Sequence, residues 1–431
     1  MRKAIARVLG GSALFFVGRI AGAVATYVVQ ILLARWIGRH ELGEYVEAFA
    51  WCLILSDVAL FGFPFAGLRF IGEDIVAGNR GRIRGFVRRT RQITLGMAIA
   101  LAAGGCATIL VTMPISEHPE VRALLVALIT LPALTLLRHY TAVAHAFAWF
   151  SLVVAPMTVL RPILLLAVVT LLWAAGVQLA AHGVMALHAG VVVILLVGLG
   201  VIVHKRLSGE LGNAPPTYQT RMWTRTASPL LIVSLFNGFF PEINVVILGL
   251  IATDGDVAIF NAGIRTAFFI GFGLYAVDQA IMPRVSQLFA GGDLVGMQRL
   301  LVLATRLKFG SAVVGAAVLG GFGESILAAF GNDFVVGYQA LLVLIATQVV
   351  RAMIGPVAQL LGITGHQDKS LAACAASIVA ILILDALLVP GFGIVGASLS
   401  ALAVTTLSSL WMLRLVVRHI GVVPAVFGRT T

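Results

Sequence analysis

The chain has 431 residues, of which 60% are hydrophobic and 11% are charged, and its formal net charge is +12. This composition excludes an ordinary soluble globular protein, in which about a quarter of the residues are charged. Apolar runs of roughly 18 or more residues recur from end to end, and each can cross a hydrocarbon core of about 30 Å. The sequence therefore predicts an all-α, multi-pass membrane protein, because the alternating pattern of barrel strands is missing.

Twelve membrane spans are expected, and the first begins close to the N-terminus. The opening segment has a basic start, but Arg19 interrupts its apolar run, and that run continues past any plausible cleavage site. We therefore interpret it as a retained span and not as a signal peptide. The expected spans cover residues 8–33, 44–70, 92–114, 121–143, 150–174, 180–203, 228–252, 257–281, 305–329, 338–361, 370–389 and 394–417.

The distribution of basic residues predicts the topology. Most of the 30 Lys and Arg lie in alternate connections and at the ends of the chain, which by the positive-inside rule places both termini in the cytoplasm. The densest run, "NRGRIRGFVRRTR" at residues 79–91, is expected to contact anionic lipid headgroups. The positive charge is thus explained by topology, and no nucleic-acid partner is expected.

The two halves of the chain look like copies of one another. With a shift of 215 residues, "LLARWIGRHELGEYVEAF" (32–49) lies over "ILGLIATDGDVAIFNAGI" (247–264). Six spans in each half give both halves the same orientation, which is the parallel-repeat plan of alternating-access transporters with a site near the midplane. The expected domains are two pseudo-symmetric six-helix bundles, residues 1–205 and 228–431, joined by a cytoplasmic linker at 206–227.

Five arginines inside the spans are singled out as candidate functional residues. Arg69 lies near a span end, where snorkelling explains it. The other four predict a hydrated cationic cavity, since lipid does not tolerate buried charge, and a guanidinium can bind the phosphates of a diphosphate bidentately. The alternative is that each arginine only pairs with an intramembrane acid such as Asp57, Glu242, Asp278, Glu324 or Asp385. The four cavity arginines are Arg19, Arg161, Arg265 and Arg351.

Three further residues are candidates for ion coupling or for lining the cavity. Glu242 and Asn244 follow a proline in "FFPEINVVI", and Asp57 lies in "LILSDVALFGFP". An internal salt bridge is the alternative for each acid. No phosphate-binding loop, nucleophile motif or metal-ligand spacing is found, so we expect no catalytic residue, no metal and no cofactor.

Four segments resemble the polysaccharide-transporter family of oligosaccharide flippases. "LLARWIGRHELGEYVEAFA" (32–50) is similar to the end of its first span and the start of its second, and "EINVVILGLIATDGDVAIFNAGIR" (242–265) to its span 7–8 signature. "LLGITGHQDKSL" (360–371) and "LVPGFGIVGASLS" (388–400) resemble later connections. The chain departs from the family at Asn244, where an aspartate is common. The family shares a superfamily with the drug and toxin (MATE) antiporters and the lipid II flippase.

The resemblance implies a bacterial inner-membrane flippase. Its substrate would be an undecaprenyl-diphosphate-linked oligosaccharide, moved to the periplasmic leaflet for lipopolysaccharide, capsule or exopolysaccharide biosynthesis, and its partners would be membrane lipids and the polysaccharide polymerase or export machinery. One alternative is a cation-coupled small-molecule exporter of the MATE type, which would have a carboxylate-lined cavity. Another is a membrane-bound polymerase or transferase, which would need a catalytic motif on an outward loop, and none is found.

Overall fold

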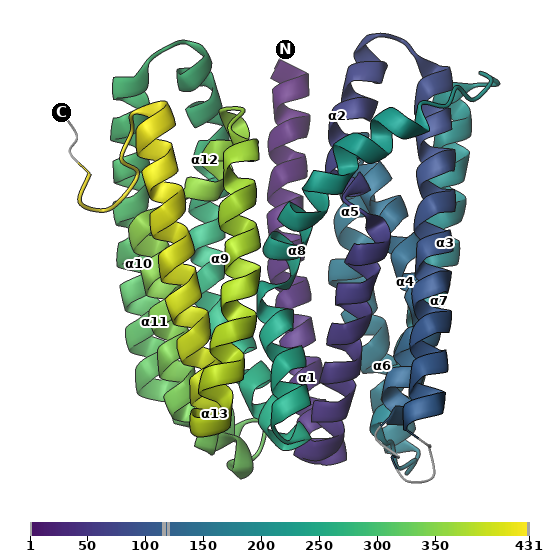
Figure 1. Cartoon of the computed structure of the whole chain (residues 1–431), viewed down its shortest axis with the longest axis vertical. Helices are drawn as coiled ribbons and strands as arrows, with labels where there is room; N and C mark the ends of the chain where they lie inside the picture. Colours follow the sequence, from purple (N-terminus) through teal and green to yellow (C-terminus); the bar gives the residue numbers. More distant parts are fainter. Residues whose placement is uncertain (1, 114–117, 119–120, 429–431) are drawn as a thin grey trace. The chain divides into compact units, whose positions relative to one another are not determined.

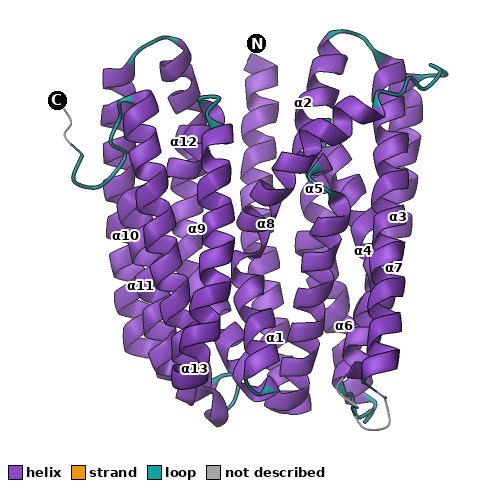
Figure 2. Cartoon of the chain, in the orientation of Figure 1, coloured by secondary structure: helices purple, strands orange, loops and turns teal. Residues whose placement is uncertain are grey.

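The computed structural model describes residues 2–113, 118 and 121–428, without the side chains of residues 2–17, 19, 237–241 and 367–368. Every regular element in the described ranges is a helix (Figure 2), and the predicted all-α fold class is confirmed. In chain order the elements are α1 (Arg2–Leu60), α2 (Phe63–Val76), α3 (Arg80–Thr112), α4 (Val121–Ala146), α5 (Phe150–Val154), the π-helix η1 (Ala155–Leu160), α6 (Arg161–Ala174), α7 (Ala181–Leu211), α8 (Thr220–Ile251), α9 (Asp254–Ala290), α10 (Leu294–Ala328), the 3-10 helix η2 (Asn332–Gly337), α11 (Tyr338–Ile354), α12 (Val357–Ile363) and α13 (Gln367–Ile420).

Nine helical stretches within the described residues are long and apolar enough to cross a membrane. Two of them, Ile20–Leu60 and Lys369–Ile420, contain 41 and 52 residues, about 60 and 80 Å of helix, which is roughly twice the hydrocarbon thickness or more. Each changes direction at a glycine with positive φ, Gly38 at 82° and Gly393 at 55°, a conformation that side chains disfavour. Each stretch is therefore long enough to hold two spans, which agrees with the predicted number of about twelve.

Three of the expected spans are interrupted, each at glycine or proline. The span at 44–70 breaks at Gly62, where φ is 74° and an added Cβ would lie 2.3 Å from the carbonyl oxygen of Ala227. The span at 150–174 contains the π-helix η1, and the span at 338–361 ends early at Gly355, just before a proline. Sequence hydropathy does not detect these breaks, because the residues on either side are equally apolar.

The chain divides into two compact units, residues 1–242 and 243–431. In unit 1, α4 packs against α1, α3 and α7, which run alongside it in Figure 1. Leu131, Leu134 and Leu137 of α4 are fully buried. Close helix approach needs small residues: a Cβ on Gly22 of α1 would lie 1.8 Å from the carbonyl oxygen of Thr158 in η1.

In unit 2, α9, α10 and α11 pack against one another, and α13 packs on α11 and α12 (Figure 1). A capping box begins α9: Thr253 Oγ1 accepts from the backbone N–H of Asp256, whose carboxylate accepts from the backbone N–H of Thr253. The division between the units falls inside α8, after Glu242. The assignment of six spans to each half, with a linker at 206–227, stays a prediction.

The connection between α7 and α8 is docked on the start of α3. Arg84 donates to the carbonyl oxygen of Ala214 at 2.9 Å, and the Thr217 backbone N–H donates to the carbonyl oxygen of Gly81 at 2.9 Å. An added Cβ on Gly85 would lie 1.9 Å from the carbonyl oxygen of Thr217, so the absence of a side chain is required. The Arg89 guanidinium lies 5.0 Å from the Tyr218 ring centre. Part of the basic run expected at lipid headgroups therefore binds the protein itself.

Candidate functional site

In unit 1, Asp57 forms an ion pair inside the apolar helices. Arg138 Nη2 of α4 lies 2.5 Å from Asp57 Oδ2 on α1, and the two side chains are 22% and 4% exposed. Ser234 Oγ of α8 donates to the second carboxylate oxygen at 3.2 Å. The sequence analysis overlooked Arg138, although it lies within the span expected at 121–143. Asp57 is thus satisfied within unit 1, which agrees with the salt-bridge alternative.

Arg161 lies directly after the π-helix η1 and is the first residue of α6. Its backbone N–H donates to the carbonyl oxygen of Pro156, five residues back, and single π-turns of this kind are frequent at functional sites. Its guanidinium carbon lies 5.1 Å from the ring centre of Phe49 on α1. A cation over an aromatic face is attracted by the ring quadrupole, and the ring adds no net charge.

A histidine and a tyrosine support the ring beneath Arg161. The rings of Phe49 and His188 have centres 4.5 Å apart, and Tyr45 Oη lies 2.9 Å from His188 Nδ1. Both Tyr45 and His188 are buried. Their hydrogen bond joins α1 to α7 and holds His188 against the Phe49 ring that Arg161 contacts.

In unit 2, three charged side chains converge from α9, α10 and α11. Lys308 Nζ lies 2.7 Å from Asp278 Oδ1, and the two side chains are 2% and 10% exposed. Arg351 is exposed and stands in the last turn of α11, where the carbonyl ends of the helix favour a cation. It interacts electrostatically with both members of the pair. Sequence analysis named Asp278 and Arg351 but missed Lys308, which α10 buries.

The remaining predicted residues lie on α1, α8 and α9. Arg265 is half-buried on α9, and Glu242 and Asn244 are buried on α8. All three interact with neighbouring groups. The side chain of Arg19 lies outside the described residues.

Asp385 is a further buried acid, on α13. Its side chain is inaccessible, and one carboxylate oxygen accepts a hydrogen bond from Ser400 Oγ, beyond the Gly393 kink. The other oxygen, Oδ2, has no hydrogen-bond partner among the described residues. From the sequence, Asp385 is expected near a span end and is one of the possible partners of the arginines. Within the described residues no arginine pairs with it.

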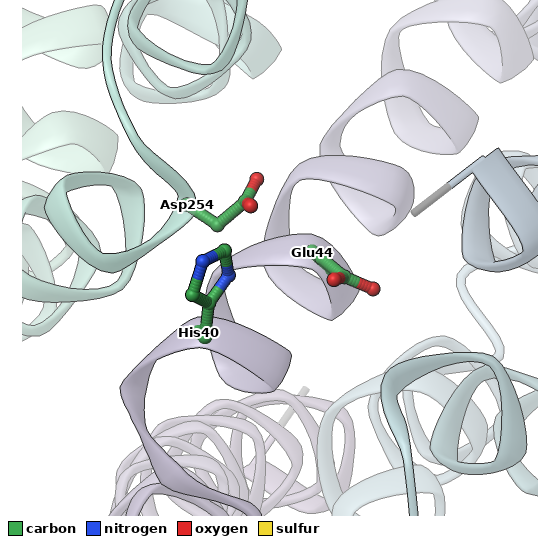
Figure 3. Close-up of side chains that lie close together, drawn as sticks. All are labelled: His40, Glu44 and Asp254. Carbon is green, nitrogen blue, oxygen red and sulfur yellow. The ribbon is translucent and has the colours of Figure 1, made fainter. Parts of the chain in front are cut away.

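Figure 3 shows three polar side chains that could be read as metal ligands. His40 and Glu44 lie one turn apart on α1 of unit 1, and Asp254 begins α9 of unit 2. A His and a Glu from one helix are an incomplete ligand set for zinc, which is held by at least three protein ligands. We assign no metal to these residues.

Together these observations define a class of protein: the long apolar helices carry buried ion pairs and arginines, which is typical of membrane transporters. The structure is similar to that of "Lipid II flippase MurJ, inward closed conformation", with a TM-score of 0.74 and 12% identity over 94% of this chain and 87% of that one. It is also similar to an inward-facing multidrug resistance MATE family transporter of the MOP superfamily, with a TM-score of 0.73 and 12% identity over 94% and 99%. A mutant of the Vibrio cholerae MATE transporter VcmN has a TM-score of 0.64 and 15% identity over 95% and 97%.

At sequence identities of 12–15%, the similarity to these solved structures shows only the fold. The family is shown by a match of the sequence to a family model. The family described as "Polysaccharide biosynthesis protein" matches residues 8–289, so the chain belongs to it. No curated protein matches the sequence. The resemblance that four sequence segments predicted is confirmed, and the chain is a multi-pass membrane protein with the fold of the MATE and MurJ transporters.

Proposed function

We propose that this protein is a flippase that moves undecaprenyl-diphosphate-linked oligosaccharide across the bacterial inner membrane for cell-surface polysaccharide biosynthesis. The observation that carries the proposal is the family match over residues 8–289. A polysaccharide pathway has sugars to carry across the membrane, and a likeness to a lipid II flippase favours a lipid-linked carrier. Both termini are proposed to face the cytoplasm, and transport is proposed to proceed by alternating access.

The intramembrane arginines are the proposed ligands of the diphosphate. Arg161 in unit 1 and Arg265 and Arg351 in unit 2 present guanidinium groups on apolar helices, and Arg19 is proposed as a fourth from its position in α1. A guanidinium matches the geometry of phosphate oxygens and keeps its charge at any physiological pH. Membrane lipids and the polymerase or export machinery are the proposed partners, and the chain is proposed to work without a catalytic residue or cofactor.

Ion coupling is proposed for the region around Glu242 and Asn244 on α8. Both side chains are buried, and an asparagine keeps the hydrogen-bonding shape of an aspartate without its charge. Asp57 is a weaker candidate, because Arg138 already neutralises it at 2.5 Å. The bundles at residues 1–205 and 228–431 remain the proposed repeat units.

A cation-coupled exporter of the MATE type is the second candidate. The TM-scores of 0.74 and 0.73 to the MurJ and MATE structures do not separate the two functions. The charges favour the flippase, because the candidate residues include three half-buried or exposed cations, Arg161, Arg265 and Arg351. Export of cationic drugs would instead favour accessible carboxylates.

The test is translocation in proteoliposomes. A short-chain polyprenyl-diphosphate oligosaccharide is incorporated, and its exposure in the outer leaflet is followed with an impermeant sugar-modifying reagent for wild type, Arg265→Ala and Arg69→Ala. We expect protein-dependent exposure that falls at least about tenfold in Arg265→Ala, the loss of a charge-assisted phosphate contact. Arg69→Ala is the matched control, because Arg69 pairs with Glu73 with both side chains more than half exposed. No exposure under any ion gradient would contradict the flippase function.

A further inference from the structure

The charges of Asp278, Lys308 and Arg351 in unit 2 do not balance. Asp278 supplies one negative charge, whereas Lys308 and Arg351 supply two positive charges. Lys308 takes the carboxylate at 2.7 Å with only 2% of its side chain exposed. Arg351 has no carboxylate within ion-pair distance among the described residues, and its one hydrogen bond there is to Gln348 Oε1 at 3.4 Å. The three side chains therefore carry a net formal charge of +1, and the guanidinium of Arg351 is the cation that is not paired with the acid.

Unit 1 contains a similar acid, Asp57, which forms an ion pair with an arginine, Arg138. There, Asp57 lies on the second expected span of its half and Arg138 on the fourth, and the two are in direct contact at 2.5 Å. In unit 2, Asp278 lies on α9 and Arg351 on α11, which are the second and fourth expected spans of the other half. The layouts correspond, except that unit 2 adds Lys308 from α10, which pairs with the carboxylate of Asp278.

The difference in burial between Lys308 and Arg351 explains why Lys308, and not Arg351, pairs with Asp278. An unpaired ammonium at the depth of Lys308 would lack water and a counter-charge, which is far more costly than leaving an exposed guanidinium without one. Arg351 is instead stabilised by the carbonyl end of α11. The pair of Lys308 with Asp278 thus excludes Arg351 from the carboxylate.

We propose that Lys308 is a positioning residue that keeps Arg351 available to a phosphate oxyanion of the substrate. By occupying Asp278, Lys308 prevents the internal ion pair that would otherwise consume the charge of Arg351. The inference rests on the proposed function, in which the substrate carries a diphosphate. It adds two residues, Lys308 and Asp278, that act on the ligand through Arg351 and do not touch it.

The test is binding of undecaprenyl diphosphate to the purified full-length protein in nanodiscs. Lys308→Met releases Asp278 to pair with Arg351, and we expect Kd to rise about tenfold or more, the scale of one charge-assisted hydrogen bond. Adding Asp278→Asn to Lys308→Met removes the competing acid, so affinity is expected to return to within about threefold of wild type, well inside the tenfold effect. In an Arg351→Ala background, Lys308→Met is expected to cause no further loss, as a double-mutant cycle requires of residues that act through one another.

Undecaprenol, which has the same chain without the diphosphate, is the matched probe. All variants are expected to bind it equally, whereas a general structural defect would weaken both ligands. The inference is overturned if Lys308→Met binds the diphosphate as wild type does, or if the Lys308→Met, Asp278→Asn double variant binds it as weakly as Lys308→Met. If Lys308→Met does not fold, the double variant alone decides, and affinity as low as that of Arg351→Ala overturns the inference. Absence of diphosphate binding by the wild type would overturn the proposed function as well.

Discussion

Replacing Arg138 by methionine tests whether the ion pair in unit 1 holds its helices together. Among the described residues, the substitution leaves Asp57, whose side chain is 4% exposed, with the hydroxyl of Ser234 at 3.2 Å as its one side-chain partner. Removing one partner of a buried pair costs about 3–5 kcal/mol. We expect the low end, about 3 kcal/mol, because Arg138 is 22% exposed and the Ser234 hydrogen bond of about 1 kcal/mol remains.

The measurement is the free energy of unfolding in mixed micelles titrated with denaturing detergent. Arg69→Met is the matched control, because the pair of Arg69 with Glu73 is 65% and 54% exposed at 2.9 Å, and exposed pairs contribute well under about 1 kcal/mol. The double variant Arg138→Met, Asp57→Asn removes both charges and is expected to recover most of the loss. Equal effects of Arg138→Met and Arg69→Met would refute the reasoning.

Two further predictions concern close packing and a buried acid. Gly85→Val places atoms against the carbonyl oxygen of Thr217 and is expected to destabilise by about 1–3 kcal/mol or more, whereas Gly96→Val, at an open helical position, is expected to leave the melting temperature unchanged. Equal melting temperatures would show that the connection is not docked there. Asp385→Asn is expected to melt no lower than wild type, because among the described residues the Asp385 carboxylate has one side-chain donor, a hydroxyl, and a buried carboxylate with so little compensation is costly to keep charged. A large drop would indicate a counter-charge at that site.

The sequence predicts the helices better than it predicts the contacts between them. Span number follows from hydropathy, because each apolar run has to cross the same thickness of lipid. Helix ends do not: α10 begins at Leu294, well before the expected start near residue 305, which puts Lys308 well inside the helix. Lys308 and Arg138 both fall within expected spans, and a charged side chain inside an apolar run is the feature by which the sequence indicates them.

The partners of these charges could not be predicted. Asp57 and Arg138 are 81 residues apart in the chain, and nothing in the local sequence of either one identifies the other. Arg161 and Phe49 are likewise distant, and their contact depends on the π-turn at η1, which shifts the register of α6. Only the prolines at 156 and 162 indicate that this helix is irregular.

Each unit holds an arginine within its apolar helices, and the surroundings of the two arginines differ. A transporter that binds an anion has to hold arginines in apolar helices without neutralising them, yet an uncompensated charge in that environment is costly. Unit 1 places Arg161 over the ring of Phe49, which attracts a cation but adds no negative charge. Unit 2 places Arg351 at a helix C-terminus and has Lys308 occupy the nearby acid. In unit 2 the guanidinium of Arg351 is thus left without a carboxylate within ion-pair distance among the described residues, which is the arrangement that the proposed phosphate ligand requires.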